Sequence, residues 1–183
     1  MELVVLLPIL AFVALAAGLV FVFRGTGRIV ARTREVETFR RTVGDLAARI
    51  DASLGGAAGQ IDAVRRHQVG PEGLSATVAA ATDAVERYTT EAEALRGPAQ
   101  AISIRADMVA DLQRAHRALE MVEHGTTILA TVRRGPRELE AQTSIKRGYL
   151  NLLHAREAVG RHALAAEELE PDEGGQKASR RGV

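Results

Sequence analysis

Near its N-terminus the chain carries a run, Leu3 to Phe23, with no charged side chain and no side chain that forms hydrogen bonds. At a rise of about 1.5 Å per residue, a helix of this length crosses a hydrocarbon core of roughly 30 Å. A lone span must pair every backbone N–H and C=O within itself, because lipid offers no partners, and a helix meets that condition. The run therefore predicts a transmembrane anchor over residues 1–23.

A cleaved signal peptide is the alternative interpretation of such a run. The apolar region of a signal peptide usually has about 7–15 residues, follows a basic residue and ends at a cleavage site with small residues. The run from Leu3 to Phe23 is longer, Glu2 rather than a basic residue precedes it, and charge follows it directly. We therefore expect the anchor to be retained.

Four arginines follow the run, namely Arg24, Arg28, Arg32 and Arg34. By the positive-inside rule they place the N-terminus outside and the C-terminal domain in the cytoplasm. Abundant Ala and Gly with almost no Lys is a composition associated with GC-rich bacterial genomes, so the expected location is the bacterial inner membrane, crossed once. These arginines are expected either to contact anionic lipid headgroups, at roughly 1 kcal/mol each, or only to set the topology.

Two short segments flank the main domain, which we place at residues 29–169. Residues 24–28 contain Gly25 and Gly27, each of which lowers helix propensity by about 1 kcal/mol relative to Ala, and are interpreted as a basic hinge beside the membrane. Whether the span continues through them into the next helix is left open. Residues 170–183 are charged and have almost nothing to bury, so this tail is expected to be disordered.

A heptad pattern opens the main domain. Apolar residues at a and d positions form one narrow stripe, consisting of Ile29, Val36, Phe39, Val43, Leu46 and Ile50. We expect this stripe to be a helix interaction seam that a second copy or a partner helix covers. The alternative is that helices of the same chain cover it. The Gly-rich stretch at residues 55–59 either interrupts this helix or lets another backbone approach it.

Three Gly-Pro pairs divide the rest of the domain: Gly70-Pro71, Gly97-Pro98 and Gly135-Pro136. Gly is typical just past the end of a helix and Pro in the first turn of the next one. The pairs predict four helical segments, near residues 29–68, 72–96, 98–134 and 136–169. Because the connections are short, the predicted fold is all-α, an antiparallel, coiled-coil-like bundle of about four long helices behind a single transmembrane helix.

The last three segments each carry an apolar stripe with steps of three and four residues, which is typical of a helix that packs on others. The stripes are Leu74, Val78, Ala81, Val85, Tyr88, Ala92 and Leu95; Ile102, Ala106, Val109, Leu112, His116, Leu119, Val122, Thr126 and Leu129; and Ile145, Tyr149, Leu152, Arg156, Val159, Ala163 and Ala166. They are rich in Ala, so we expect close helix packing around a thin core without a sizeable ligand pocket.

Histidines offer the one arrangement with metal-ligand character. If the third and fourth segments form a hairpin that turns at Gly135, the numbers of two residues that face each other across the hairpin add up to about 270. This relation places His116 near His154, with Glu120 one helical turn away. Two His and one Glu are suitable ligands for zinc or iron. However, the Glu-x-x-His pairs of carboxylate-bridged di-iron bundles are absent, and the chain has no Cys. We therefore expect neither a metal site nor a cofactor, with these three residues as the fallback candidates.

No catalytic motif is present in the sequence: it has neither a G-x-S-x-G nucleophile motif nor a phosphate-binding glycine loop. Nucleic-acid binding is not expected either, since the aromatics are few and the basic residues gather beside the predicted anchor.

No small-molecule substrate is evident and no family motif is recognised. We expect a non-enzymatic scaffold or adaptor that binds the bilayer and either itself or a partner helical protein. The alternatives are a regulatory or signalling subunit of a larger membrane complex and, less favoured, a His/Glu metal-binding bundle with enzymatic activity.

Overall fold

The structure, a computed structural model, describes residues 2–131 and 135–170, with side chains described from residue 31 onward except at residue 136. This part of the chain consists of helices and their connections and contains no strand, which confirms the predicted all-α fold. The elements are α1 (Glu2–Arg65), the 3-10 turn η1 (Pro71–Gly73), α2 (Leu74–Ala94), the 3-10 turn η2 (Ala99–Ala101), α3 (Ile102–Thr131) and α4 (Pro136–Glu167).

The chain forms two compact units. The first contains residues 1–37 and 170–183, and the second contains residues 38–169. Among the residues whose side chains are described, no helix has both the length and the apolar character needed to cross a membrane. The side chains of the predicted anchor at residues 1–23 and of the hinge lie outside those residues, as do residues 171–183 of the tail. The backbone of α1 is helical through Gly25 and Gly27.

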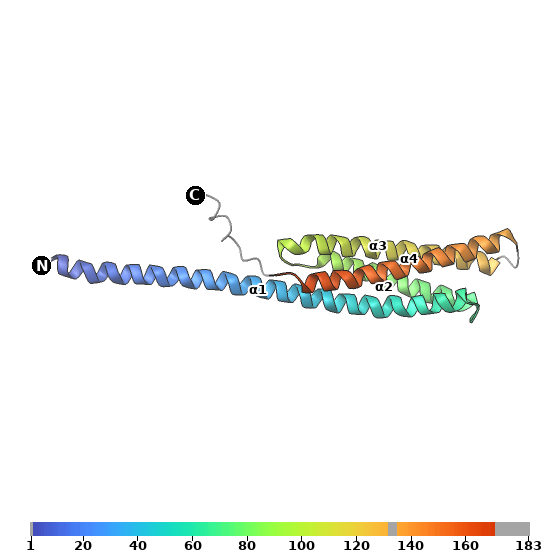
Figure 1. Ribbon diagram of the computed structural model, residues 1–183, viewed down its shortest axis with the longest axis horizontal. Helices are drawn as coiled ribbons and strands as arrows, with labels where there is room; N and C mark the ends of the chain where they lie inside the picture. Colours follow the sequence, from blue (N-terminus) through green and yellow to red (C-terminus); the bar gives the residue numbers. More distant parts are fainter. Residues whose placement is uncertain (1, 132–134, 171–183) are drawn as a thin grey trace. The chain divides into compact units, whose positions relative to one another are not determined.

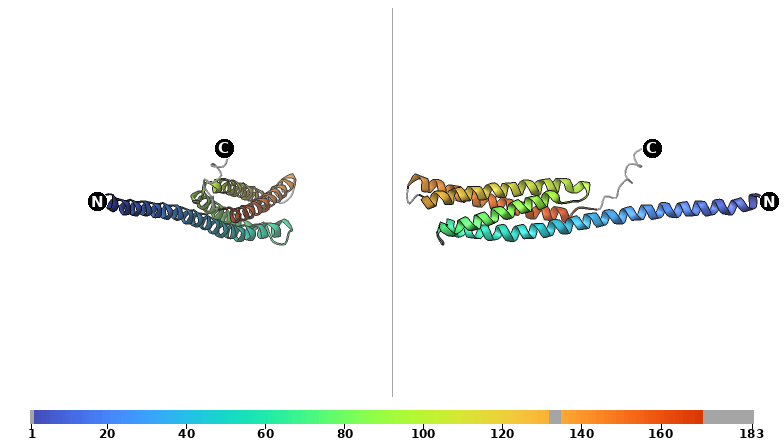
Figure 2. Two further views of the ribbon diagram at one scale, coloured as in Figure 1. Left: turned by 60° about the vertical axis from the view of Figure 1, so that its left-hand side comes forward. Right: turned by 180° about the vertical axis from the view of Figure 1, so that it is seen from behind.

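The second unit is a four-helix bundle that falls within the predicted domain of residues 29–169. It contains the C-terminal half of α1 together with α2, α3 and α4, and consecutive helices run antiparallel (Figure 1). Side-chain contacts join α1 to α2 and to α4, and α3 packs on α2 and on α4. The helices thus follow one another around the bundle axis, and Figure 2 shows the same bundle from two further directions.

The connections lie at the Gly-Pro pairs, as predicted. Gly70 and Gly135 precede the helical turns that Pro71 and Pro136 begin, and Gly135 has a φ of 135° that glycine adopts readily. Gly97 faces the ring of Phe39, where an added Cβ would lie 2.5 Å from Cδ2. A side chain at residue 97 would therefore collide with the core under the connection between α2 and α3.

The predicted seam of α1 is buried within the chain itself. Phe39, Val43, Leu46 and Ile50 are almost inaccessible to solvent and belong to the bundle core. The expectation that a second copy or a partner helix covers these four residues is therefore wrong, because α2, α3 and α4 are long enough to cover them. Val36 is also buried, and Ile29 lies outside the residues whose side chains are described.

Residues 55–59 do not interrupt α1. The helix continues to Arg65 through the glycines, and the buried side of this stretch is formed by Ala57 and Ala58. Gly55 faces the guanidinium of Arg156 on α4, where an added Cβ would lie 3.3 Å from Cζ. The Gly-rich stretch thus admits a side chain of another helix.

The stripe predicted for α2 is buried or half-buried throughout, but the stripe predicted for α3 starts out of phase. Ile102 is 56% exposed and Ala106 is exposed, whereas Ala101, Ile104 and Met108 are buried. The core side of α3 thus begins in the preceding turn η2 and follows steps of three and four from Ala101. The prediction was wrong here because it gave the apolar Ile102 a core position.

Glycines set the close approach of α3 and α4. A Cβ on Gly148 would lie 2.6 Å from the carbonyl oxygen of Ala118, and one on Gly125 would lie 2.8 Å from that of Ala141. Backbone atoms of one helix therefore occupy the space where the other would carry a side chain. These two positions keep the pair close along its length.

Candidate functional site

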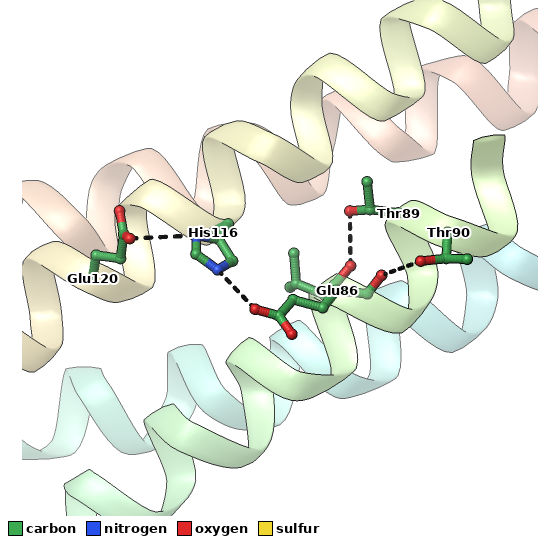
Figure 3. Close-up of polar contacts among 6 residues, drawn as sticks. Glu86, Thr89, Thr90, His116 and Glu120 are labelled. Carbon is green, nitrogen blue, oxygen red and sulfur yellow. Dashed lines mark hydrogen bonds and ion pairs between the residues drawn. The ribbon is translucent and has the colours of Figure 1, made fainter.

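The three residues considered as metal ligands do not form one group. The register of α3 and α4 is close to the predicted one, since Gly125 faces Ile145. The side chain of His116 nevertheless faces α2, where its Nε2 lies 3.3 Å from Oε1 of Glu86, while its Nδ1 lies 3.7 Å from Oε1 of Glu120 (Figure 3).

His154 is exposed on α4 and lines the groove between α3 and α4 instead. Among the described residues, no group of three or more His, Asp or Glu side chains is placed to hold a metal ion. The predicted proximity of His116 and His154 was wrong because facing residue numbers specify the register of two helices, whereas each side chain also has a direction around its helix axis.

A polar cluster around one buried carboxylate lies between α3 and α4, and the sequence prediction missed it. Asp111 is the one charged residue that is buried in the described part of the bundle. Its Oδ2 lies 2.7 Å from Nε2 of His162 on α4, and its Oδ1 accepts a hydrogen bond from Nη1 of Arg114. Both carboxylate oxygens therefore have partners, which is the condition under which a charge is tolerated in a protein interior.

Signals for this cluster were present in the sequence. Asp111 follows Met108 by three residues and precedes Ala115 by four, so it occupies a core step of α3. Residues 111 and 162 also fit the hairpin register of α3 and α4. A carboxylate in an apolar seam opposite a histidine indicates a buried pair.

A groove of about 330 Å³ opens beside this cluster, with polar walls and a floor of alanines. Asp111, Arg114, Arg117, Ala118 and Met121 line it from α3, and Asn151, His154, Ala155, Ala158 and Arg161 line it from α4. The alanines leave room between the helices because their side chains end at Cβ. The groove presents guanidinium, imidazole and amide donors, together with one carboxylate that is already paired.

A second hollow, of about 620 Å³, lies at the end of the bundle where α1 ends and α4 begins. The charges in its lining are balanced, because it contains the basic residues Arg65 and Lys146 and the acidic residues Glu72 and Glu138. The expectation of no sizeable pocket was therefore wrong at the end of the bundle, where the ends of α1 and α3 and the start of α4 form the walls together with the connection that follows α1.

His67 belongs to the lining of this end hollow and has a φ of 58°, in the left-handed region. The backbone closes the end of α1 around it, with Gln68 N–H donating to the carbonyl oxygen of Ala63 at 2.8 Å. Glycine is the common residue at such a position, so the sequence carried no strong signal for it.

Bidentate ion pairs connect α1 to its neighbours. Nε of Arg156 lies 2.5 Å from Oδ1 of Asp51, and its Nη2 lies 3.1 Å from Oδ2. This hydrogen-bonded guanidinium holds the pKa of Asp51 below its ordinary value, because it stabilises the charged carboxylate. Arg49 makes the corresponding pair with Glu91 on α2 and lies over the ring of Tyr88, 5.7 Å from its centroid. These pairs orient the helices and create no reactive group.

The arginines expected at the membrane surface are only partly described. Arg32 and Arg34 are exposed, and the side chains of Arg24 and Arg28 lie outside the described residues. Their predicted contact with lipid headgroups stays a prediction.

Comparison of the chain with protein-family models, curated proteins and solved structures finds no match.

Proposed function

We propose that the chain is a membrane-anchored helical-bundle protein that acts as a non-enzymatic scaffold or adaptor at a bacterial inner membrane. The observation that carries the proposal is the uncharged run from Leu3 to Phe23 with four arginines directly after it. A run of this length is stable across lipid as a helix, and the arginines favour the cytoplasmic side. In this proposal the bundle is held in the cytoplasm beside the membrane.

The packing of the bundle supports binding rather than chemistry as its role. Its core is filled by its own apolar side chains, and the charged pairs of Arg156 with Asp51 and of Arg49 with Glu91 join helices to one another. The described polar groups of these pairs therefore satisfy each other. What the bundle offers to other molecules lies on its surface.

One face of α4 supports the partner part of the proposal. Leu139, Leu150 and Leu164 are exposed on this helix, at 69%, 43% and 61%. Their spacings of 11 and 14 residues are close to three and four helical turns, so all three lie on the same side of α4. Exposed leucines aligned along one helix suit contact with a second copy or with another helix.

Membrane extraction of the full chain and of a variant without residues 1–23 tests the anchor. We expect the full chain to stay in the membrane fraction after alkaline carbonate washing, and the shortened variant to be released, because only the former has a lipid-spanning segment. Release of the full chain by carbonate, or recovery of a mature chain that lacks residues 1–23, would overturn the anchor.

Cross-linking through single cysteines tests the partner surface, since the native chain has no Cys. Leu150→Cys should give inter-chain or partner adducts in native membranes. Val43→Cys is the matched control and should give none, because Val43 is fully buried in the bundle. Adducts from neither Leu150→Cys nor Leu139→Cys would reject this face as the partner surface.

A further inference from the structure

We propose that the groove between α3 and α4 binds a phosphate-type oxyanion, either a free phosphate compound or the headgroup phosphate of an anionic lipid. Arg114, Arg117 and His154 are the residues that would hold it. The proposal goes beyond the scaffold function and does not depend on the anchor, because every residue that it uses lies in the bundle.

The charge of the lining favours an anion. Three arginines stand against one aspartate in this groove, so its lining is net positive before His154 is counted. Arg161 on α4 pairs with Glu157 at 3.2 Å, so Arg114 and Arg117 on the α3 wall carry the remaining positive charge of the arginines. The hollow at the end of the bundle has no such excess, because its two acidic residues balance its two long basic ones.

Asp111 does not cancel this preference, because both of its oxygens are already used. One accepts from Arg114 and the other lies 2.7 Å from His162, and the residue is only 4% exposed. The carboxylate therefore holds Arg114 at the groove from below. The remaining N–H groups of the guanidinium are available to a ligand, since an arginine has five donors and this pair uses one. Asp111 is thus a positioning residue for the anion site.

Two cationic or potentially cationic groups have no partner among the described residues. Arg117 on α3 and His154 on α4 line opposite walls of the groove, and both are exposed. On the α4 wall, the amide of Asn151 donates to the sulfur of Met121, 3.8 Å away, and has no other partner among the described residues. Arg117 and His154 thus line one hollow from opposite walls without an acceptor among the described residues.

Phosphate is the ligand chemistry that this donor set fits best. Guanidinium groups bind phosphate oxygens through paired hydrogen bonds, and imidazole and amide N–H groups supply single ones. The alanine floor leaves about 330 Å³, enough for a phosphate or diphosphate group. An extended apolar ligand would instead leave these donors without partners, which is costly.

Titration of the purified full chain in an uncharged detergent with inorganic pyrophosphate, followed by calorimetry, tests the proposal. We expect saturable binding that weakens as the salt concentration rises. Arg117→Gln should weaken it roughly tenfold, because one charge-assisted contact is lost, and His154→Ala should also weaken it. Arg87→Gln, which removes an exposed arginine of α2 outside the groove, is the matched control and should have no effect. Thermal melting should show that all three variants are folded.

Nanodiscs distinguish the two sources of phosphate. If the ligand is a lipid headgroup, phosphatidylglycerol nanodiscs should weaken pyrophosphate binding relative to phosphatidylcholine nanodiscs, and Arg117→Gln should remove the difference. If it is a free phosphate compound, affinity should be equal in both. Absence of saturable binding in detergent and in both nanodiscs, or equal weakening by Arg87→Gln and Arg117→Gln, would overturn the site. Neither result bears on carbonate extraction, so failure of this site and failure of the anchor are separable.

Discussion

Replacing Gly148 by Ala should destabilise the bundle, although alanine is the better helix former. The new Cβ would lie 2.6 Å from the carbonyl oxygen of Ala118 and 2.7 Å from Cγ2 of Val122. The carbonyl oxygen moves only if α3 moves, so the substitution forces the two helices apart. Overpacking of this kind costs up to about 3 kcal/mol, and the gain in helix propensity offsets about 1 kcal/mol of it. We therefore expect a net loss of about 2 kcal/mol.

Gly160→Ala provides the matched control in the same helix. No atom lies within 4 Å of a Cβ at Gly160, which is exposed, so only the propensity term remains and stability should rise by about 0.5–1 kcal/mol. Urea unfolding of the full chain in detergent, followed by circular dichroism, measures both. The midpoint urea concentration should fall for Gly148→Ala and rise for Gly160→Ala. Equal changes in the two variants would refute the close approach of α3 and α4 at Gly148.

Three further outcomes follow from the same structure. Val85→Asp should lower the free energy of unfolding by several kcal/mol in urea titrations, because Val85 is fully buried, whereas the neighbouring exposed Glu86→Ala should change it little. Asp111→Ala should cost about 1–2 kcal/mol by the same assay, since it leaves Nε2 of the half-buried His162 without its hydrogen-bond partner; a change within error would show that the pair is dispensable. Asp51→Asn should cost at most about 1 kcal/mol at pH 7 because the pair is exposed. The folded pKa of Asp51 lies below its ordinary value of 3.8, so the stability that the pair with Arg156 contributes is present above pH 3.8 and is lost as the pH falls through the folded pKa. The difference in stability between Asp51→Asn and the unmodified chain should therefore vanish in acid. A difference that grows in acid would contradict the assigned pair.

The connections between α1, α2, α3 and α4 could be predicted because they depend on local chemistry, whereas the sequence left open that residues 2–65 form the single helix α1. Gly70-Pro71 and Gly135-Pro136 end one helix and begin the next wherever the rest of the chain packs. The heptad of α1 likewise identified Phe39 and Ile50 as residues that avoid water. What covers them is a property of the whole fold, and the pattern alone did not distinguish a partner helix from the chain's own helices. Burial of both residues in the bundle core answers that question.

The groove shows where prediction from the sequence ends. Register arithmetic placed His116 opposite His154, but it does not specify which way each side chain turns around its helix. His116 turns to Glu86 on α2, while His154 stays on the α4 wall. The pair of Asp111 and His162 obeys the same arithmetic and does meet, because both residues lie on the facing sides of their helices. A search for polar residues at positions of the helix that face the core would have found the pair of Asp111 and His162.

The most direct test of the central claim, a bundle anchored to the inner membrane with its helices in the cytoplasm, is a pair of reporters fused after Val183. One should be a fluorescent protein that folds in the cytoplasm, and the other a phosphatase that is active only outside it. The positive charge that follows the anchor predicts fluorescence without phosphatase activity, from an uncleaved chain in the membrane fraction. Phosphatase activity without fluorescence, or a fusion protein that has lost residues 1–23, would contradict the account.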